Sequence, residues 1–444
     1  MTNWYIWAII IFMKRTHLSK LKPGKTVMVQ GWVDTIRDQK SIMFLVLRDR
    51  EAKVQVTILK NKMPEIAEKL EGILTDSTLK IIGKVVAAPQ VKLGGIEIIP
   101  ASVEVTSSAK VAPIDEKSSV DLLMDYRWID LRDENKRAVF QVQTEILAAM
   151  RDYFVKNKFI EIMTPKITGQ GTEGGAEVFE VKYYDRKAYL TQSPQLFKQM
   201  AISSGFEKVF EIGACYRAEK SYTSRHATEF FALDVELGFV EDGHCPMNCE
   251  EEMLKYVLGR VAKNCKGLLE QLGVEIHLPT GPFPRVTLLD SYKLLEDERG
   301  YIVSKAAKGD LDPEAERLLC EISREKWNSD FIFITNFPSS ARPFYVMRLN
   351  DNQKITQGFD LLYKGVEITS GGQREHRPDH LRANLVDKGM NPDDMQFYID
   401  FFEYGCPPHG GFALGIARFV ARMLDLPNVR ESTFLFRGPD RISP

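Results

Sequence analysis

The chain has 444 residues, of which 44% are hydrophobic and 27% are charged, and these values are ordinary for a folded soluble protein. They exclude a disordered, a collagen-like and a disulfide-rich chain, and six cysteines in this length are typical of a reducing compartment. The net charge of -2 hides an asymmetry, because residues 1–110 hold 17 Lys and Arg against 10 Asp and Glu. A basic first quarter indicates either a contact with a polyanion or a solvated lysine-rich surface.

The chain begins with an apolar run from Trp4 to Phe12, which is about half as long as a membrane span. It lacks the basic start and the small-residue cleavage site of a secretory signal. We interpret residues 1–17 as an N-terminal extension, in which residues 1–12 precede the true start at Met13; a short segment packed on the fold is the alternative. We therefore expect a cytoplasmic protein with no membrane partner.

Residues 18–106 form the first predicted unit. From Lys53 to Ile58 the apolar residues alternate, as a half-buried strand requires. A helix from Pro64 to Leu74 follows the third of five predicted strands, which are Thr26–Val33, Met43–Arg48, Lys53–Ile58, Leu79–Val86 and Ile96–Val105. This order is typical of an OB-fold barrel, a frequent binder of single-stranded nucleic acid, although other small barrels share it.

Residues 107–125 are predicted to be a linker, because Ser107 to Val120 is rich in Ser and has no hydrophobic period. The second unit, residues 126–444, contains an amphipathic helix from Lys136 to Lys156. Asp312 before Pro313 predicts the start of another helix. There is no βαβ alternation and no GxxxxGK[ST] loop, which argues against a P-loop or a doubly wound nucleotide site.

Four stretches of the second unit are densely polar where a core would be apolar. Paired glycines beside carboxylates favour a loop that closes over a ligand, although a plain surface turn is the commoner origin of such a pair. A strand–loop–strand carrying Lys220, Arg225 and His226 is suited to a polyphosphate. The four stretches are TEGGAE (172–177), QSPQLFK (192–198), the run from Phe210 to Glu236, and GVEITSGGQREHR (365–377).

Together these stretches identify a resemblance that covers residues 13–444. The chain resembles the class II aminoacyl-tRNA synthetases and, within them, the aspartyl-tRNA synthetases of the archaeal type. The segment from Phe159 to Pro165 resembles motif 1 of this class, whose proline lies at the dimer interface in the family. Motif 2 resembles the segment from Tyr216 to Glu236, and motif 3 the segment from Gly411 to Arg418.

The resemblance implies an α+β fold. It consists of an N-terminal five-stranded OB-fold β-barrel and a class II catalytic domain with a mainly antiparallel sheet flanked by helices. The activity that it implies is the ATP-dependent attachment of L-aspartate to tRNA(Asp), in a homodimer, through an aspartyl-adenylate. It also implies Mg²⁺, bound by Glu367 and Ser370, since Mg²⁺ prefers oxygen ligands together with phosphates.

The resemblance also assigns roles around the ATP. Arg217 would bind the α-phosphate and the substrate carboxylate, and with Arg418 would form the catalytic pair. Arg225 and His226 would reach the outer phosphates. Phe230 would stack under the adenine, with Arg418 over it. The implied ATP site comprises Arg217, Glu219, Arg225, His226, Phe230, Glu367 and Arg418.

The amino acid has its own implied contacts. Glu173 and Gln195 would bind the α-ammonium group, and Lys198 and Arg374 the side-chain carboxylate. The related asparaginyl enzymes usually carry an acidic residue where Lys198 stands, so this lysine favours aspartate. The implied aspartate site comprises Glu173, Gln195, Lys198, Arg217, Ser370 and Arg374.

In this family the barrel binds the anticodon. The resemblance implies that Phe44 stacks on an anticodon base, with Arg37 and Gln55 making polar contacts. From the residues alone, barrel core is the favoured alternative for Phe44. The residue after Gly31-Trp32-Val33 helps to set the tRNA in relatives and is often Trp or His there, whereas here it is Asp34. An enzyme that charges both tRNA(Asp) and tRNA(Asn) is therefore the first alternative.

Motif 3 departs from the family pattern. The family usually has glycine where Ala413 stands and glutamate where Ala417 stands, and it usually ends in Leu-Phe-Pro-Arg-Asp where this chain has Phe-Leu-Phe-Arg-Gly at 434–438. Since Arg217, Arg418, Glu367 and Ser370 remain, we expect activity. A paralogue that binds tRNA or adenylate without charging tRNA is the second alternative.

Overall fold

The computed structural model describes residues 13–169, 178–220, 223, 225–304, 307 and 309–444. The N-terminal residues 1–12 and the predicted closing loop, Glu173 included, lie outside the described residues. The chain divides into two compact units, Met1–Asp115 and Glu116–Pro444. Within the described ranges, no helix combines the length and the apolar character that crossing a membrane would need.

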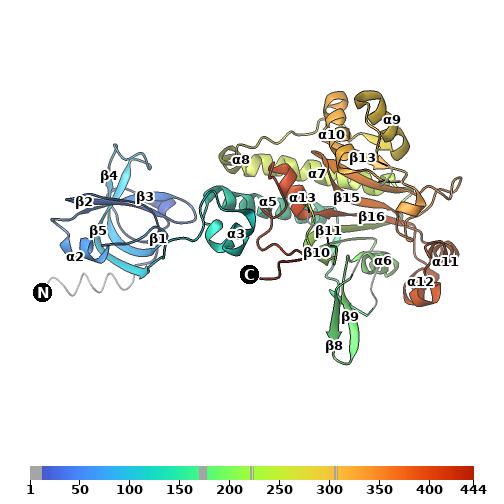
Figure 1. Ribbon diagram of the computed structural model, residues 1–444, viewed down its shortest axis with the longest axis horizontal. Coiled ribbons are helices and arrows are strands. Elements are labelled where there is room, and N and C mark those ends of the chain that lie inside the picture. Colours follow the sequence, from blue (N-terminus) through green and yellow to red (C-terminus); the bar gives the residue numbers. More distant parts are fainter. Residues whose placement is uncertain (1–12, 170–177, 221–222, 224, 305–306, 308) are drawn as a thin grey trace. The chain divides into compact units, whose positions relative to one another are not determined.

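The first unit is a closed five-stranded barrel, which confirms the predicted OB-fold (Figure 1). Buried residues at alternate positions of each strand, such as Met43, Leu45 and Leu47, form its core. The barrel order is β1 (Thr26–Asp38), β2 (Ile42–Arg48), β3 (Lys53–Leu59), β5 (Ile96–Ser107) and β4 (Thr78–Ala87). A short 3-10 helix, η1 (Leu18–Lys20), precedes the barrel.

Two elements of the barrel differ in length from the prediction. Strand β1 continues to Asp38 instead of ending at Val33, because its first half pairs with β4 and its second half with β2, with an irregularity between Val33 and Thr35. Helix α2 (Pro64–Lys69) is shorter than predicted. The chain turns away after it through Gly72, whose φ of 68° favours glycine.

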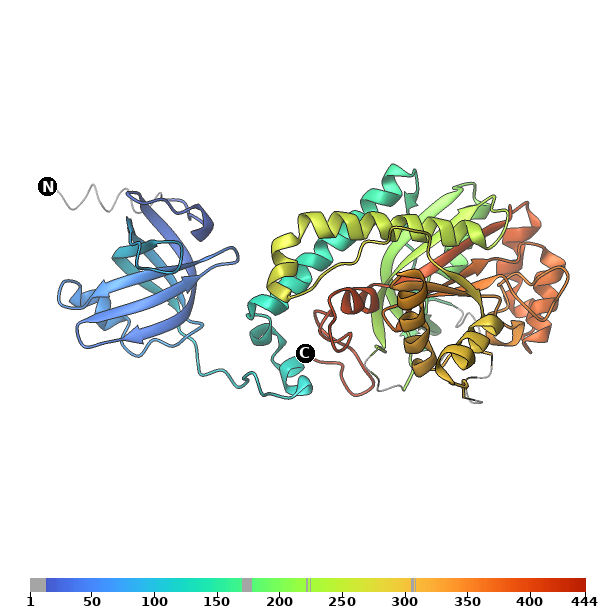
Figure 2. The same cartoon turned by 90° about the horizontal axis from the view of Figure 1, so that it is seen from above.

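The second unit is built on an eight-stranded, mainly antiparallel sheet, which confirms the predicted class II architecture and the α+β class (Figure 2). Its order is β12 (Arg285–Thr287), β13 (Phe331–Thr335), β14 (Gly358–Tyr363), β15 (Val366–Gln373), β16 (His409–Gly415), β11 (Glu229–Gly238), β10 (Lys208–Tyr216) and β6 (Ile160–Glu161). A smaller sheet has the order β7 (Ile167–Thr168), β9 (Arg186–Leu190) and β8 (Glu180–Tyr183).

Two long helices, α5 (Glu134–Lys156) and α7 (His244–Asn264), pack together on one face of this sheet (Figure 2). Helix α5 begins two residues before the prediction, since the Asp133 carboxylate caps it by accepting from the backbone N–H groups of Asn135 and Lys136. On β11, Leu233 and Val235 join this core. The intervening residues of the strand therefore face the opposite side of the sheet, where the candidate site lies.

Shorter helices surround the sheet. As predicted, helix α10 (Pro313–Trp327) begins at Pro313, and the Asp312 carboxylate accepts from the backbone N–H of Ala315. The other helices are α3 (Val120–Asp125), α4 (Arg127–Asp130), α6 (Gln195–Ser203), α8 (Lys266–Leu272), α9 (Leu288–Arg299), α11 (Pro378–Asp387), α12 (Gln396–Glu403) and α13 (Ile416–Met423), with 3-10 turns η3 (Ser339–Ala341) and η4 (Pro392–Met395).

Candidate active site

A cavity of about 380 Å³ opens on the face of the sheet opposite α5 and α7. Strands β10, β11, β15 and β16 and the first turn of α13 line it, so three of the four polar stretches of the sequence meet here. The site residues predicted from the sequence that line the cavity are Gln195, Arg217, Glu219, Arg225, His226, Phe230, Glu367, Ser370, Arg374 and Arg418. Lys198 is not among the lining residues.

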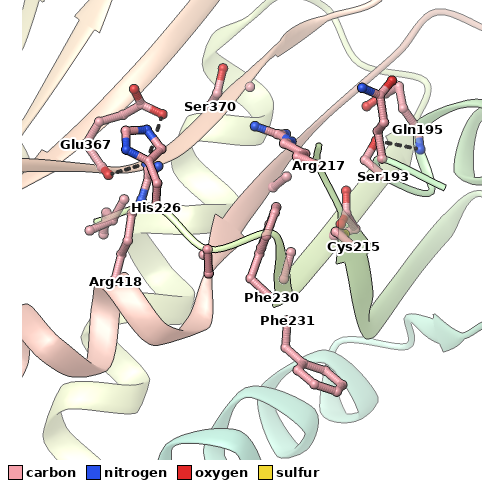
Figure 3. A pocket seen from close by; sticks show the side chains of 18 of the residues that line it. Ser193, Gln195, Cys215, Arg217, His226, Phe230, Phe231, Glu367, Ser370 and Arg418 are labelled. Atoms are coloured by element: carbon pink, nitrogen blue, oxygen red, sulfur yellow. Dashed lines mark hydrogen bonds and ion pairs between the residues drawn. The ribbon is translucent and has the colours of Figure 1, made fainter. Parts of the chain in front are cut away.

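Arg217, directly after the end of β10, and Phe230, on the neighbouring strand β11, face the same part of the cavity. The Arg217 guanidinium carbon lies 5.3 Å from the centre of the Phe230 ring, within the range of a cation–π contact. The ring of the next residue, Phe231, points away from Phe230 and Arg217 (Figure 3). The pair therefore offers a flat apolar face and a positive charge side by side.

One end of the cavity, which we name the Arg418 end, contains Arg225, His226, Glu367 and Arg418 (Figure 3). The Arg418 guanidinium donates to the backbone carbonyls of Arg225 (3.2 Å) and Glu367 (3.1 Å), and its Nη1 lies 3.7 Å from Glu367 Oε1. Arg418 is thus held in place although position 417 is alanine. Burial, together with the charge of Arg418, lowers the pKa of His226.

A glutamate of α10 holds part of the Arg418 end. Glu316 Oε2 accepts from Arg225 Nη1 at 2.6 Å and from the backbone N–H of Glu367 at 3.1 Å. Burial raises the pKa of Glu316 to about 7, against the opposing effect of Arg225. Arg225 therefore lies against α10 in this structure, while still lining the cavity.

Next to Ser370 lies a carboxylate that the sequence analysis did not assign. Asp360 on β14 is paired across the strands with Ser370 on β15 and forms an ion pair with Arg342. Arg342 also donates to Ser370 Oγ at 3.1 Å. Asp360 Oδ1 is buried and has no hydrogen-bond partner among the described residues, and burial raises the pKa of this carboxyl against the charge of Arg342.

These oxygens fit a divalent cation. Ser370 and Glu367 supply the hydroxyl and carboxylate oxygens that were predicted, and the unpaired Oδ1 of Asp360 adds a third hard donor on the neighbouring strand. A bound cation would also relieve the cost of keeping the Asp360 carboxylate in a buried place. The donor set is therefore chemically suited to Mg²⁺.

The other end of the cavity, which we name the Arg374 end, is lined by Gln195, Asp234 and Arg374, and the buried Lys198 and Glu236 are paired with these residues. Lys198 is only 2% exposed, and its ammonium lies 3.1 Å from Asp234 Oδ1 and 3.3 Å from Glu236 Oε2. It also donates to the carbonyls of residues 235 and 412. Arg374 Nε donates to Glu236 Oε1 at 3.0 Å. Two cations and two carboxylates are therefore interlocked here.

The two carboxylates of the Arg374 end differ in their electrostatics. Burial alone would raise the pKa of Glu236, but Arg374 and then Lys198 outweigh it and the pKa is lowered. For Asp234, burial outweighs the attraction of Lys198 and raises the pKa. Since Arg374 and Asp234 line the cavity and Lys198 does not, Lys198 lies one ion pair behind the surface that a ligand would meet.

Sequence reasoning missed Arg342, Asp360 and Glu316. Asp360 carried a usable signal, because it is the one charged residue of the strand GFDLLY, all of whose residues are buried. Arg342 and Glu316 carried none, since an arginine before Pro343 and a glutamate on an amphipathic helix are ordinary features.

On the barrel, the three residues predicted for the anticodon lie on one outer face. Phe44 on β2 pairs with Arg37 on β1, whose guanidinium carbon lies 5.4 Å from the ring centre. Gln55 on β3 accepts from Arg37 at 3.4 Å and donates to Glu97 at 3.0 Å. Phe44 is half-buried, and its neighbours Met43 and Leu45 are the residues that enter the core. The barrel-core alternative for Phe44 is therefore wrong.

Comparison with known proteins assigns each of the two units to a family. Residues 119–437 match the family of tRNA synthetases class II (D, K and N), and residues 27–106 match the OB-fold nucleic acid binding domain. The chain belongs to the class II tRNA synthetases of this D, K and N family, and it is an enzyme of that class.

Individual relatives match over nearly the whole chain. An aspartate–tRNA(Asp) ligase of Pyrococcus abyssi is 42% identical over 97% of this chain and 100% of its own length. An aspartate–tRNA(Asp/Asn) ligase of Aeropyrum pernix is 40% identical over 95% and 96%. The crystal structure of an asparaginyl-tRNA synthetase from Pyrococcus horikoshii complexed with asparaginyl-adenylate has a TM-score of 0.89 at 32% identity, covering 97% of this chain and 100% of that one. Fold alone therefore does not separate aspartate from asparagine.

Proposed function

We propose that this chain uses ATP to attach aspartate to tRNA through an aspartyl-adenylate. The observation that carries the proposal is the Arg374 end, where a buried guanidinium lines the cavity and a second buried cation, Lys198, lies behind it. A short side-chain carboxylate is the group that such a guanidinium binds best. The Pyrococcus abyssi and Aeropyrum pernix relatives, both named as aspartate–tRNA ligases, support the same amino acid.

Adenylate formation needs positioning more than a protein nucleophile. The α-carboxylate of the amino acid attacks the α-phosphorus of ATP, and the bond from that phosphorus to the pyrophosphate oxygen breaks. Arg217 would neutralise charge at the α-phosphate, and the Phe230 ring beside it would receive the adenine. Arg225 and His226 would bind the outer phosphates, for which Arg225 must leave Glu316.

The proposed metal site consists of the side-chain oxygens around Ser370. Glu367 and Ser370, with Asp360 from the next strand, would hold Mg²⁺, which neutralises phosphate charge when bound. Arg342 now donates to the Ser370 hydroxyl and pairs with Asp360. It would therefore have to share these oxygens or move to the phosphates.

The test is a two-stage assay of the purified full chain. Aspartate-dependent exchange of pyrophosphate into ATP reports the adenylate, and aspartylation of purified tRNA(Asp) and tRNA(Asn) reports the acceptor. We expect exchange with aspartate and charging of tRNA(Asp). Absence of exchange at saturating ATP and Mg²⁺ would overturn the proposal and favour a non-charging paralogue.

The second acceptor remains a specific alternative, because a relative named for tRNA(Asp) and one named for tRNA(Asp/Asn) match this chain at 42% and 40% identity. Asp34, at the position that differs among relatives, forms ion pairs with Arg48 and Lys53. Charging of tRNA(Asn) at a comparable rate would establish the broader activity.

We also propose that the outer barrel face binds the anticodon. A base stacked on Phe44 contributes about 1–3 kcal/mol. Phe44→Ala should therefore lower the rate of tRNA aspartylation at limiting tRNA by about tenfold or more and leave pyrophosphate exchange unchanged. Phe206→Ala, which removes an exposed aromatic side chain from the second unit, is the control. Equal losses in both half-reactions would mean that Phe44 supports the fold and not the tRNA.

A homodimer is the proposed assembly. Strand β6 is an edge strand of the eight-stranded sheet, and the apolar side chains around it are exposed, with Met163 at 94% and Ile160 at 44%. Exposed apolar groups beside a sheet edge favour burial against a second copy. Sedimentation should give about twice the 50.6 kDa chain mass; a monomer at micromolar concentration would contradict this.

The proposed location is the cytoplasm. All six cysteines are free thiols in the structure, which suits a reducing compartment where tRNA is charged.

A further inference from the structure

A buried hydrogen-bond network of polar side chains runs from the Arg374 end of the cavity into the protein interior. It links Gln195 and Gln199 on α6, Tyr398 on α12 and His409 at the start of β16. Gln199, Tyr398 and His409 are fully buried, and Gln195 is nearly so. None of the three inner residues touches the cavity, and the activity proposed above gives them no role.

The donors and acceptors of this network can be assigned by starting from His409, at its inner end. His409 Nδ1 lies 2.9 Å from the carbonyl oxygen of Pro407, which can only accept, so Nδ1 carries the proton. The Cys406 thiol lies farther away, at 3.7 Å, and competes weakly. Burial lowers the pKa of His409 to about 4. The imidazole is therefore neutral near pH 7, and its other nitrogen, Nε2, must accept.

The orientation of Gln199 follows from that acceptor. Its amide nitrogen lies 2.8 Å from His409 Nε2, so the nitrogen donates there. Its amide oxygen is left to accept, and it receives the Tyr398 hydroxyl at 2.9 Å and Gln195 Nε2 at 2.9 Å. Reversing this amide would place two donors, or two acceptors, against each other in a buried site, which costs the full desolvation of both groups.

The orientation of Gln199 in turn determines the orientation of the Gln195 side-chain amide. Because its Nε2 is used inside the protein, its Oε1 is the branch left for the cavity that Gln195 lines. Its backbone N–H also donates to Ser193 Oγ (Figure 3). An amide oxygen accepts from an ammonium group, whereas an amide nitrogen would repel it.

We propose that His409, Gln199 and Tyr398 form a positioning relay that holds the Gln195 amide with its oxygen toward the cavity, where it accepts a hydrogen bond from the α-ammonium group of the amino acid. The relay rests on the proposed function, because it needs an amino acid as the ligand. It deepens that function because the recognition of the ammonium group by Gln195 then depends on three residues that do not touch the substrate.

The test compares ligands with and without the ammonium group. In Gln199→Met, which keeps the length of the side chain and removes the amide, Gln195 can rotate. The KM for aspartate in pyrophosphate exchange should rise about tenfold or more, as expected for a lost hydrogen bond to a charged group. The KM for ATP should not change. The Ki of succinate, which has both carboxylates and no ammonium, should also stay at the parent value.

Two further variants separate positioning from stability. Tyr398→Phe removes one donor to Gln199 and should shift the aspartate KM in the same direction by a smaller factor. Ile399→Val, an apolar change in the same buried cluster, should leave all three constants at parent values. Aspartate, succinate and ATP weakened together in Gln199→Met, or an unchanged aspartate KM in both relay variants, would overturn the relay. A parent enzyme without aspartate exchange would instead refute the proposed function.

Discussion

The two ends of the cavity are built in different ways. At the Arg374 end, Arg374 and Glu236 are 4% and 0% exposed and are paired with each other at 3.0 Å. At the Arg418 end, Arg418 and Glu367 are 24% and 37% exposed, and backbone carbonyls hold the arginine. A buried ion pair is costly to break, and an exposed one is screened by water. The Arg374 end is therefore a fixed part of the fold, and the Arg418 end can rearrange around a ligand.

The largest expected effect is on stability at the Arg374 end. Glu236→Gln removes the charge that faces both Lys198 and Arg374, and an uncompensated buried charge costs about 3–5 kcal/mol. We expect a clear fall in the free energy of unfolding, measured by denaturant titration, together with loss of aspartate-dependent exchange.

The control for this variant is Glu314→Gln, which breaks the exposed pair of Glu314 with Arg317 and should change the free energy of unfolding by no more than about 0.5 kcal/mol. Similar falls in the free energy of unfolding of the two variants would mean that the buried ion pairs of the Arg374 end stabilise the protein no more than an exposed pair does.

A second buried glutamate sharpens the comparison, because it forms no ion pair with any residue of the described ranges. Both carboxyl oxygens of Glu250, on α7, lack hydrogen-bond partners among the described residues. Burial raises the pKa of Glu250 from its ordinary value of 4.5 to about 8. Between these two pH values the folded state binds a proton that the unfolded state has lost. Stability from this group is therefore fully present below about pH 4.5 and is lost as the pH rises through about 8.

Glu250→Gln replaces the ionisable carboxyl with a neutral amide, so the variant should not lose this stability as the pH rises. The free energy of unfolding of the variant minus that of the parent should increase between about pH 5 and pH 7 by up to about 2.7 kcal/mol, the limit for one proton over two pH units. Thermal unfolding of both proteins across this range is the measurement. A difference that does not change with pH would mean that Glu250 titrates normally.

The smaller effect is expected at the Arg418 end. Arg418→Ala removes a guanidinium held mainly by backbone carbonyls, so the KM for ATP should rise about tenfold. The aspartate KM should stay at the parent value, and the melting temperature should stay within about 2 °C. Arg422→Ala, one turn later on α13 and outside the cavity, is the matched control. If Arg418→Ala destabilised the protein as much as Glu236→Gln, the two ends of the cavity would not differ in their contribution to stability.

The sequence predicted the parts of the molecule whose signals are local. The alternation in Lys53–Ile58 and the caps at Asp133 and Asp312 depend on neighbouring residues, so the barrel and the helix starts could be anticipated. Most site residues came from short contiguous motifs, and ten of those predicted for the second unit line one cavity.

The rest depends on contacts between distant segments. Arg342 meets Asp360 and Ser370 only because β14 and β15 pair side by side. Gln199 and His409 are 210 residues apart, and nothing in either local sequence indicates that they touch. Lys198, which was predicted to bind the side-chain carboxylate, is not among the residues that line the cavity. Which residue of a buried ion pair faces a cavity depends on packing that no motif encodes.

The central claim is that the Arg374 end selects a carboxylate side chain, and amino-acid-dependent pyrophosphate exchange tests it most directly. The parent should prefer aspartate to asparagine by about a thousandfold or more in kcat/KM, because the aspartate carboxylate forms a charge-assisted, bidentate pair with the Arg374 guanidinium, whereas the neutral asparagine amide offers it one acceptor oxygen and no charge. Arg374→Leu should lower exchange with aspartate at least about a hundredfold at an unchanged KM for ATP, and Arg377→Leu, outside the cavity, should not. A parent that activates asparagine equally well, or an Arg374→Leu enzyme with near-normal exchange, would contradict the account.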